Sequence, residues 1–498
     1  MKTKQGISGI RGLLLLLGLA LVVPGCSNPV GGNTVPPDQA AVINGITGFL
    51  NARGPNTPET PYTVTLPAIN ISDAWGAIAD AVEQSGKYVI LNLSGCSATG
   101  NSVEGSSSPS GNDMNIIYDN SYIKGIILPN SLTGIGDNAF YNCYNLTSVT
   151  IPPGVTSIGH YAFSSCYNLT GVSIPAGVTS IGNSAFTFCR QMSGITVAGA
   201  NQYYSSPGGV LFTKDKSTLI QYPAGRSDTS YAIPNSVTAI GNSAFAGCYN
   251  LTEVFIPAGV TAIGDYAFAY TGLTSVSIPV GVTSIGNSAF AGCSNLTGVS
   301  IPAGVTSIGN MAFVACYQLS AITVDSANQN YSSAGGVLFN KDQSTLIQYP
   351  NGRSETSYAI PNSVTDIGSS AFYNCSNLTG ITFPATLTTI NSDAFAYCSN
   401  LADITFPDAL TTINSYAFYQ CEALTSVTFP AAVTNIGGWA FSYCRNLISV
   451  TFGGENTTIG SNAFPGGESG AGSDRLKNAY NAASPKAGEY RRDLWSKS

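Results

Sequence analysis

Charge is scarce in this sequence, and histidine is almost absent from it. Only 9% of the 498 residues are Asp, Glu, Lys or Arg, against about 25% in an average soluble protein. Nineteen basic and 26 acidic residues give a net charge of −7, which argues against a nucleic-acid-binding surface, because such a surface is basic. The single histidine, His160, argues against histidine-based catalytic triads and histidine-rich metal sites.

Catalytic patterns are missing as well. The carboxylates are scattered, and Glu253 and Asp403 occupy expected strand positions in repeats that lie far apart. No pair of carboxylates is therefore placed for acid–base chemistry. No phosphate-binding loop with the Gly-Lys-Ser/Thr ending follows an expected strand. We predict that the protein is not an enzyme and uses no cofactor and no metal.

The one long apolar run lies at the N-terminus. Three basic residues in the first eleven precede an apolar stretch over 12–23, which is shorter than the roughly 20 residues that a membrane-spanning helix needs. This arrangement is typical of a signal peptide, predicted here over 1–25. The run ends in Val-Pro-Gly-Cys26, which resembles a bacterial lipobox, although Val and Pro replace the preferred Leu and Ala or Ser.

The lipobox resemblance implies cleavage before Cys26 and attachment of lipid to this residue. Several acyl chains anchor a protein stably, since each buried CH₂ contributes about 0.8 kcal/mol. Ordinary cleavage, with Cys26 as a bystander, is the alternative. Residues 26–60 are rich in Pro, Asn, Gly and Thr and predict a flexible tether, with a short helix around 39–50.

The body of the chain is a repeat. The dipeptide Ala-Phe recurs with Phe at 140, 163, 186, 245, 268, 290, 313, 372, 395, 418, 441 and 464. Most intervals are 23 residues, one is 22, and two are 59, which is one period plus a 36-residue extension. A period of this length indicates a solenoid.

The spacing within one copy predicts the coil. Leu146, Val149 and Ile151 fit a short strand with its apolar residues pointing inward. Pro152 then ends the strand, and Gly154 and Gly159 supply corners. One coil cannot bury its own apolar side, but a stack of coils can. We predict an α/β repeat solenoid with one short parallel strand per coil of about 23 residues.

The frame Leu-x-x-Val-x-Ile-Pro-x-x-Val-x-x-Ile-Gly-x-x-Ala-Phe-x-x-Cys resembles the Treponema-type, BspA-like leucine-rich repeat family over about residues 121–464. It departs from the commonest leucine-rich repeat, which has Asn or Cys where this frame has Gly154. The resemblance implies a leucine-rich-repeat array. It also implies a cell-surface protein, since family members are mostly surface proteins and some bind host matrix proteins or other bacteria.

Two irregular repeats, near 195–235 and 322–362, are copies of one another. Each contains Gly-Gly-Val-Leu-Phe and then Ser-Thr-Leu-Ile-Gln-Tyr-Pro, with charged residues between the two runs. Two apolar runs around a polar tip predict a β-hairpin. Either these repeats protrude as binding elements, or they bend the rod.

The open ends of a solenoid need caps. Residues 61–120 predict an N-terminal cap, with a strand over 62–66, a helix over 73–84 and a strand over 87–93 that starts the stack. The solenoid then runs over 121–464. Residues 465–498 predict a C-terminal cap, with a short helix over 474–483 and a strand over 488–495.

Ten of the twelve cysteines form a column, because each lies three residues after a repeat Phe. A small apolar thiol packs well at a coil corner, so we predict a buried, reduced ladder. Pairing of neighbours is the alternative and is geometrically demanding.

Serine and threonine dominate the outward strand positions, and many of the 26 tyrosines fall in variable positions of the frame. Binding loops favour Tyr, Ser, Asn and Gly, which give rigid contacts and adaptable hydrogen bonds. Strand propensity and repeat homogenisation are the alternatives. The candidate binding residues are Tyr144, Tyr167, Tyr249, Tyr317, Thr150, Thr382, Thr405 and Thr428.

These features together predict an exported protein that is lipid-anchored to the bacterial envelope at the outer membrane or cell surface. Its predicted role is adhesion, with host matrix proteins, host cell-surface proteins or other bacteria as partners and no nucleic acid. A structural or scaffolding lipoprotein of the periplasm is the alternative.

Overall fold

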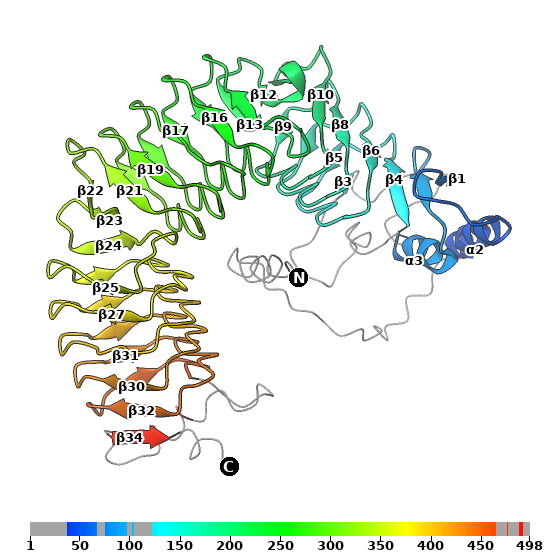
Figure 1. Ribbon diagram of the computed structural model, residues 1–498. Helices are drawn as coiled ribbons and strands as arrows, with labels where there is room; N and C mark the ends of the chain where they lie inside the picture. The colour runs from blue at the N-terminus through cyan, green and yellow to red at the C-terminus, as the bar shows by residue number, and fades with distance from the viewer. Residues whose placement is uncertain are drawn as a thin grey trace, which may run out of the picture.

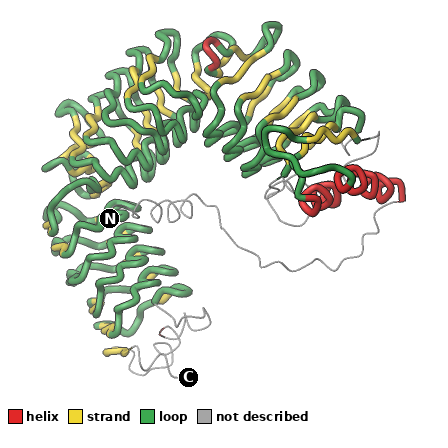
Figure 2. Tube along the Cα trace, turned by 45° about the vertical axis from the view of Figure 1, so that its right-hand side comes forward, coloured by secondary structure: helices red, strands yellow, loops and turns green. Residues whose placement is uncertain are grey.

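Successive coils stack side by side into an arched rod, with α2 near one end and β34 at the other (Figure 1). The computed structural model describes residues 37–66, 75–96, 102–103, 122–464, 476 and 488–491. Most of each coil is loop, the strands are short, and the α-helices gather at the N-terminal end (Figure 2). The predicted solenoid, with parallel strands about 23 residues apart, is confirmed.

The predicted strand of each coil forms a first ladder along the rod. In β6 (Ser148–Thr150) Val149 is buried between two exposed residues, as the alternation predicted. The other strands of this ladder are β4 (Ile123–Ile127), β8 (Gly171–Ile174), β10 (Gly194–Val197), β14 (Ser230–Ala232), β16 (Glu253–Phe255), β19 (Gly298–Ile301), β21 (Ala321–Val324), β25 (Ser357–Ala359), β27 (Gly380–Thr382), β30 (Ser426–Phe429) and β32 (Ser449–Phe452).

The structure adds a second strand to most coils. Strand β7 (Ser157–Ile158) is two residues long and is followed by Gly159, where an added Cβ would lie 2.5 Å from the backbone nitrogen of Asp137. This glycine permits close approach of the coils. The other strands of this second ladder are β3 (Ser102–Val103), β5 (Gly134–Ile135), β9 (Ser180–Ile181), β15 (Ala239–Ile240), β17 (Ala262–Ile263), β18 (Ser284–Ile285), β20 (Ser307–Ile308), β26 (Asp366–Ile367), β28 (Thr389–Ile390), β29 (Thr412–Ile413), β31 (Asn435–Ile436) and β33 (Thr458–Ile459).

The repeat phenylalanines stack through the core. Within each run of regular coils, neighbouring rings lie 4.7–5.6 Å apart and nearly parallel. Tyr222 and Tyr349 take the same position in the irregular repeats and stack on Phe245 and Phe372. Each buried ring contributes about 1.5–3 kcal/mol by leaving water.

Hydrogen bonds between coils fix the turn around each Ala-Phe pair. The N–H groups of Tyr161, Phe163 and Ser165 donate to carbonyl oxygens of the next coil at 2.8–3.1 Å. Tyr161 and Ser165 both have positive φ, near 60°. A tyrosine in this left-handed region is costly, so the bonds to the next coil hold a conformation that the side chain alone disfavours.

The two irregular repeats contain the predicted hairpins. In the first, β11 (Tyr204–Ser205), β12 (Leu211–Thr213) and β13 (Thr218–Gln221) pair antiparallel, with a short 3-10 turn, η3 (Pro207–Gly209), before β12. In the second, β22 (Tyr331–Ala334), β23 (Val337–Asn340) and β24 (Thr345–Gln348) do the same. The second ladder breaks after β9 and after β20, and each hairpin begins a new sheet.

The N-terminal strands continue the first ladder. Strands β1 (Tyr62–Thr65) and β2 (Val89–Asn92) lie in one parallel sheet with β4 and β6, and α3 (Trp75–Ser85) buries Ile78 and Val82. Helix α2 (Pro37–Asn51) packs against α3. This helix lies where the sequence predicts a short helix within the tether, and it is docked rather than free, because Ile46 and Leu50, one turn apart, are both buried.

At the other end, β34 (Gly488–Arg491) pairs antiparallel with β32, within the range of the predicted strand. Leu476 is helical and buried. The rest of the predicted helix over 474–483 lies outside the described residues, as does the signal peptide.

The described column cysteines are buried, free thiols. Most of them donate a hydrogen bond to the carbonyl of a repeat Phe in the preceding coil, as Cys398 does to Phe372 at 3.0 Å. Burial raises the pKa of the Cys398 and Cys444 thiols to about 12, so the reactive thiolate of these two residues is scarce at neutral pH.

We therefore expect iodoacetamide at pH 8 to leave the column cysteines unlabelled in the folded protein and to label all of them in guanidinium. Mass spectrometry of peptides, with and without prior reduction, measures both states. Labelling of column cysteines in the native state, or labelling in guanidinium only after reduction, would contradict the buried, reduced ladder.

Candidate functional site

Aromatic side chains occupy turn positions that flank the Ala-Phe pair in many coils. Tyr161 and Tyr443, for example, are each 44% exposed at positive φ. Such positions recur coil after coil, so their side chains line up along the rod. We call this set the aromatic surface; it comprises Tyr144, Tyr161, Tyr167, Phe188, Tyr249, Tyr266, Tyr270, Tyr317, Tyr373, Tyr397, Tyr416, Tyr419, Trp439 and Tyr443.

The aromatic surface is continuous in the C-terminal half of the rod. The rings of Tyr373, Tyr397, Tyr419 and Tyr443 follow one another at 5.2–5.4 Å, each edge-on to the next. Tyr416 contacts Tyr419 edge-on and stacks on Trp439 at 6.0 Å. Edge-to-face packing fixes ring positions, which makes the surface rigid.

Small apolar residues support these rings from below. Ala269, Ala315 and Ala396 are buried in one cluster with other residues of the same turn positions, and Tyr270, Tyr397 and Tyr419 pack against them. Burial and the neighbouring hydroxyls of Tyr249 and Tyr317 raise the pKa of Tyr270. The aromatic surface therefore passes from the middle of the rod to its C-terminal half.

Two of the predicted tyrosines flank an arginine, and a third stacks on one of them. Tyr144 stacks on Tyr167 at 5.2 Å. The guanidinium of Arg190 lies 4.7 Å from the Tyr167 ring centre and 4.9 Å from that of Tyr249, whose hydroxyl it contacts at 3.1 Å. Arg190, which the sequence analysis missed, thus bridges coils on either side of the first irregular repeat.

Tyr317 lies at the second irregular repeat. It is 41% exposed, and its hydroxyl accepts a hydrogen bond from Asn374 at 3.2 Å. Asn374 is 57 residues further along the chain, beyond the repeat. Tyr249 and Tyr317 therefore have structural contacts across the irregular repeats in addition to their exposed surface.

The predicted threonines lie elsewhere, on the first ladder. All four are exposed. Thr382 in β27, Thr405 and Thr428 in β30 follow one another in successive coils, although Thr405 lies outside any strand, while Thr150 lies in β6 near the other end of the rod. In each coil the predicted tyrosine lies in the turn that precedes the strand position of the predicted threonine, as Tyr144 precedes β6.

Asp393 is the functional candidate that the sequence analysis missed. It has the same positive-φ position as Tyr416 and Trp439 in the next two coils. Burial raises the pKa of its carboxyl to about 6. Its neighbours include the hydroxyls of Tyr373 and Tyr397. The available signal was the frame itself, because sibling coils carry uncharged residues at this position.

His160 has a structural contact. Its ring nitrogen Nδ1 accepts a hydrogen bond from the backbone N–H of Asn183 in the next coil, at 3.0 Å. Asp265 and Asn287 use side-chain oxygens in the same way. His160 is exposed, as predicted for a surface residue.

Charges in the irregular repeats are used internally. Arg226 pairs with Asp228 at 2.6 Å and donates to the carbonyl of Gly208 in the loop before β12. Arg353 repeats this arrangement with Glu355 and the carbonyl of Gly335. These contacts favour the interpretation that the irregular repeats shape the rod.

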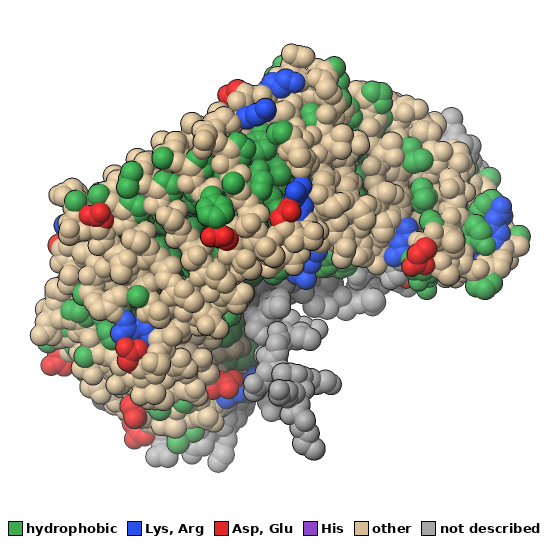
Figure 3. All heavy atoms as spheres, turned by 45° about the horizontal axis from the view of Figure 1, so that its top comes forward, with side chains coloured by type: hydrophobic (Ala, Val, Ile, Leu, Met, Phe, Trp, Pro, Cys, Tyr) green, Lys and Arg blue, Asp and Glu red, His purple; other side chains and the backbone are tan. Residues whose placement is uncertain are grey.

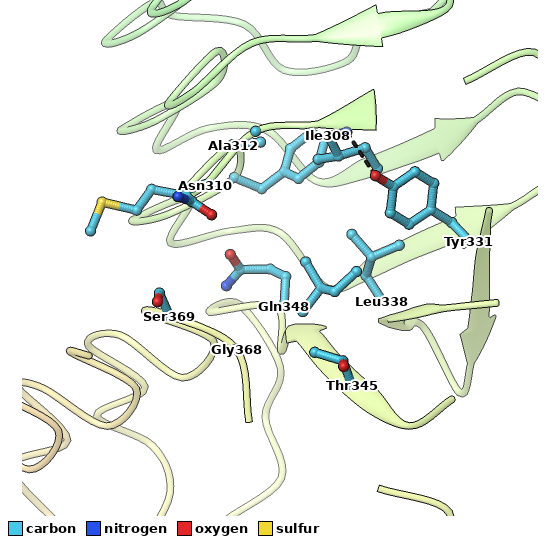
Figure 4. A pocket seen from close by; sticks show the side chains of 13 residues that line it. Ile308, Asn310, Ala312, Tyr331, Leu338, Thr345, Gln348, Gly368 and Ser369 are labelled. Carbon is cyan, nitrogen blue, oxygen red and sulfur yellow. Dashed lines mark hydrogen bonds between the residues drawn. The ribbon is translucent and has the colours of Figure 1, made fainter. Parts of the chain in front are cut away.

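A cavity of about 230 Å³ lies at the second break in the ladder, between β20 and the second hairpin. Asn310, Gln348 and Ser369 approach one another across it, and Tyr331 accepts a hydrogen bond from the backbone N–H of Ile308 at 2.9 Å (Figure 4). At the first break, the Ser184 and Ser243 hydroxyls are bonded at 2.8 Å. The corresponding position at the second break is Met311, which lines the cavity.

Charged side chains lie singly or in small groups on the face shown in Figure 3, among uncharged polar and hydrophobic ones. Within the described ranges, no cluster of three or more His, Cys, Asp or Glu is placed to hold a metal. No described helix has the length and apolar character for a membrane span. Cys26 lies outside the described residues.

Comparison with known proteins gives one family and several similar solved structures. The model of the BspA type leucine-rich repeat region matches six copies over 114–207, 224–341 and 349–469. No curated protein matches the chain.

Several solved structures are similar. A leucine-rich repeat protein from Eubacterium ventriosum is 23% identical over 72% of this chain and 89% of its own, with a TM-score of 0.42. A leucine-rich cell surface protein from Faecalibacterium prausnitzii is 28% identical over 71% and 88%, with a TM-score of 0.40. The pneumococcal vaccine antigen PcpA is 19% identical over 81% and 76%, with a TM-score of 0.35.

The raised pKa of Asp393 makes a stability prediction. The folded state binds the proton more tightly than the unfolded chain, so the ionised carboxylate destabilises the fold increasingly as pH rises from about 4 to 6. We expect Asp393→Asn to raise the free energy of unfolding by about 1–2 kcal/mol at pH 7.5, after allowance for partial exposure. The gain should shrink to a small remainder at pH 4, since Asn also suits positive φ.

Urea unfolding followed by circular dichroism, at several pH values, measures this difference. Asp408→Asn is the control, because Asp408 is exposed in a turn and its replacement should give a flat, near-zero profile. A gain for Asp393→Asn that does not depend on pH would contradict the burial of an ionised carboxylate.

Proposed function

The chain belongs to the BspA-type leucine-rich repeat family, and from that premise we propose that it is a bacterial cell-surface binding protein and adhesin. The observation that carries this proposal is the aromatic surface. It presents rigid, partly exposed rings over many coils, with few charges around them.

Tyrosine and tryptophan suit protein recognition because each gives a large contact area and a polar tip at little cost in conformational entropy. Here the backbone bonds between coils hold the turns, and the edge-on packing holds the rings. Binding therefore requires little further ordering of these side chains. Many modest contacts along the rod supply the affinity, and no single residue dominates.

Host extracellular-matrix proteins, host cell-surface proteins and other bacteria are the proposed partners. Lipid on Cys26 holds the chain to the envelope after loss of residues 1–25. The proposed organisation continues with a linking region over 26–60, which includes α2, an N-terminal cap over 61–120, the solenoid over 121–464 and a C-terminal cap over 465–498. This arrangement presents the solenoid at the cell surface.

We expect protease added to intact producing cells to remove the solenoid while a periplasmic control protein survives. Cys26→Ala should release the protein from the membrane fraction, because the thiol that carries the lipid is lost. Immunoblots of shaved cells and of membrane and soluble fractions measure both results. Survival of the wild-type protein until the outer membrane is broken would instead favour a periplasmic scaffold.

For the binding role, we expect Tyr416→Ser combined with Trp439→Ser to weaken attachment at least tenfold. Serine occupies this position in sibling coils, for example at Ser288, so the coil should tolerate the change. Attachment to a panel of immobilised matrix proteins and to cells of other bacteria is measured with the purified chain.

The matched variant is Thr405→Ala combined with Thr428→Ala, on the first ladder. Retained attachment of the serine variant with loss in the threonine variant would place binding on the ladder. Full attachment of both variants, or no attachment of the wild-type chain to any partner, would overturn the proposal.

A further inference from the structure

Asp393 is a partly buried charged residue with no partner of opposite charge in the described part of the chain. Its side chain is only partly exposed, and within the described part of the chain no hydrogen bond or ion pair is assigned to its carboxylate. Sibling positions carry uncharged residues. A carboxylate removed from water and left without a partner lowers stability, so this residue has a cost that its own fold does not offset.

Aromatic rings surround this carboxylate. The backbone N–H of Asp393 donates to the carbonyl of Ser415 at 3.1 Å, so Asp393 lies directly beside Tyr416 of the next coil. Burial raises the pKa of the Tyr373, Tyr397 and Tyr416 hydroxyls, and the charge of Asp393 adds to the rise. Tyr373 is buried and packs edge-on against Tyr397 at 5.2 Å. Tyr416 is 39% exposed, so the group is accessible from solvent on that side.

A second polar group in the same column also lacks a partner. Ser370 precedes Asp393 by one coil at the same turn position, with positive φ. It is fully buried, and its hydroxyl makes no hydrogen bond. The serines at the first break satisfy each other, whereas Met311 stands at the corresponding position here and offers no hydroxyl.

The described ion pairs all lie elsewhere: Arg226–Asp228, Arg353–Glu355 and Arg445–Glu422. Burial raises the pKa of the Asp393 carboxyl, and no basic side chain contributes to the shift. A cation supplied from outside the chain would offset the cost of this partly buried charge.

Arg190 shows how rings of this surface hold a cation. Its guanidinium lies between the Tyr167 and Tyr249 rings, within 5 Å of both centres, which is the geometry of a cation–π interaction. A carboxylate beside tyrosine rings adds a charge-assisted hydrogen bond to the same attraction. Asp393 has this second component and lacks the cation.

We propose that Asp393, Tyr397 and Tyr416 form a binding site for a cationic side chain, arginine or lysine, of a protein partner. This inference rests on the proposed function, because it assigns a chemical class of partner to one part of the aromatic surface. The carboxylate pairs with the cation, and the tyrosine rings cover the side chain. Exposed basic residues on the partner are then required for recognition at this site.

The test uses the full chain and a fluorescein-labelled nonapeptide of alternating glycine and arginine, measured by fluorescence anisotropy at pH 7.5. Matched peptides carry lysine, or citrulline, which keeps the shape of arginine without its charge. We expect the arginine and lysine peptides to bind, and we expect Asp393→Asn to lower their affinity about tenfold. Asp408→Asn, with the same change in net charge, should weaken them less than twofold.

Acidification supplies a second readout. A carboxyl with a pKa of about 6 is mostly ionised at pH 7 and mostly protonated at pH 5, so wild-type affinity should fall about tenfold over this range. The affinity of Asp393→Asn should stay nearly constant. Tyr416→Ser should lower the affinity for the peptides at both pH values. Thermal melts confirm that each variant is folded.

Equal binding by wild type and Asp393→Asn, or equal binding of the citrulline peptide, overturns the inference. Equal losses in Asp393→Asn and Asp408→Asn also overturn it, because they indicate general attraction to an acidic protein. This outcome can be distinguished from failure of the proposed function. Peptide binding that depends on Asp393, without attachment to any matrix protein or cell, would contradict the adhesin role and still support this site.

Discussion

Each coil of this protein depends on the coil that follows it. The N–H of Phe163 donates to Ala185 of the next coil, the hydroxyl of Thr179 to Thr156 of the preceding one, and the thiol of Cys166 to Phe140. Burying an unpaired backbone N–H or C=O group of a turn is costly. Here each such group is paired because the equivalent turn of the neighbouring coil lies directly beside it. A chain with few charges can therefore form a long rod, because regular neighbours replace ion pairs as the source of specificity.

The same constraint explains the aromatic surface. The turn at each Ala-Phe pair needs positive φ on both sides, and the hydrogen bonds between coils impose it whatever the side chain. The side chain at this position is then free to vary, from the buried Ser370 to Asp393, Tyr416 and Trp439 in the next three coils. Variation at a rigid, repeated position is how a solenoid acquires a binding surface without losing its core.

The irregular repeats interrupt this regularity, and different contacts join the coils on the two sides of each break. Each ends one hydrophobic core and begins the next. At the first, Arg190 spans the break between Tyr167 and Tyr249. At the second, Asn374 donates to Tyr317, and a cavity remains beside Met311. The two copies are nearly identical in sequence, so the residues just outside them decide how well each break is closed.

The sequence by itself determined the solenoid, the first ladder and the buried cysteine column, because each follows from spacing within one period. It also determined the hairpins, because each irregular repeat has two apolar runs around a polar tip. Only the tertiary structure decided the second ladder, the fold of α2 on α3, the bridging role of Arg190 and the surroundings of Asp393. The second ladder joins residues 23 positions apart, and the Arg190 bridge joins residues 59 positions apart. Their contacts depend on how coils align across the irregular repeats, and a one-dimensional frame does not contain that alignment.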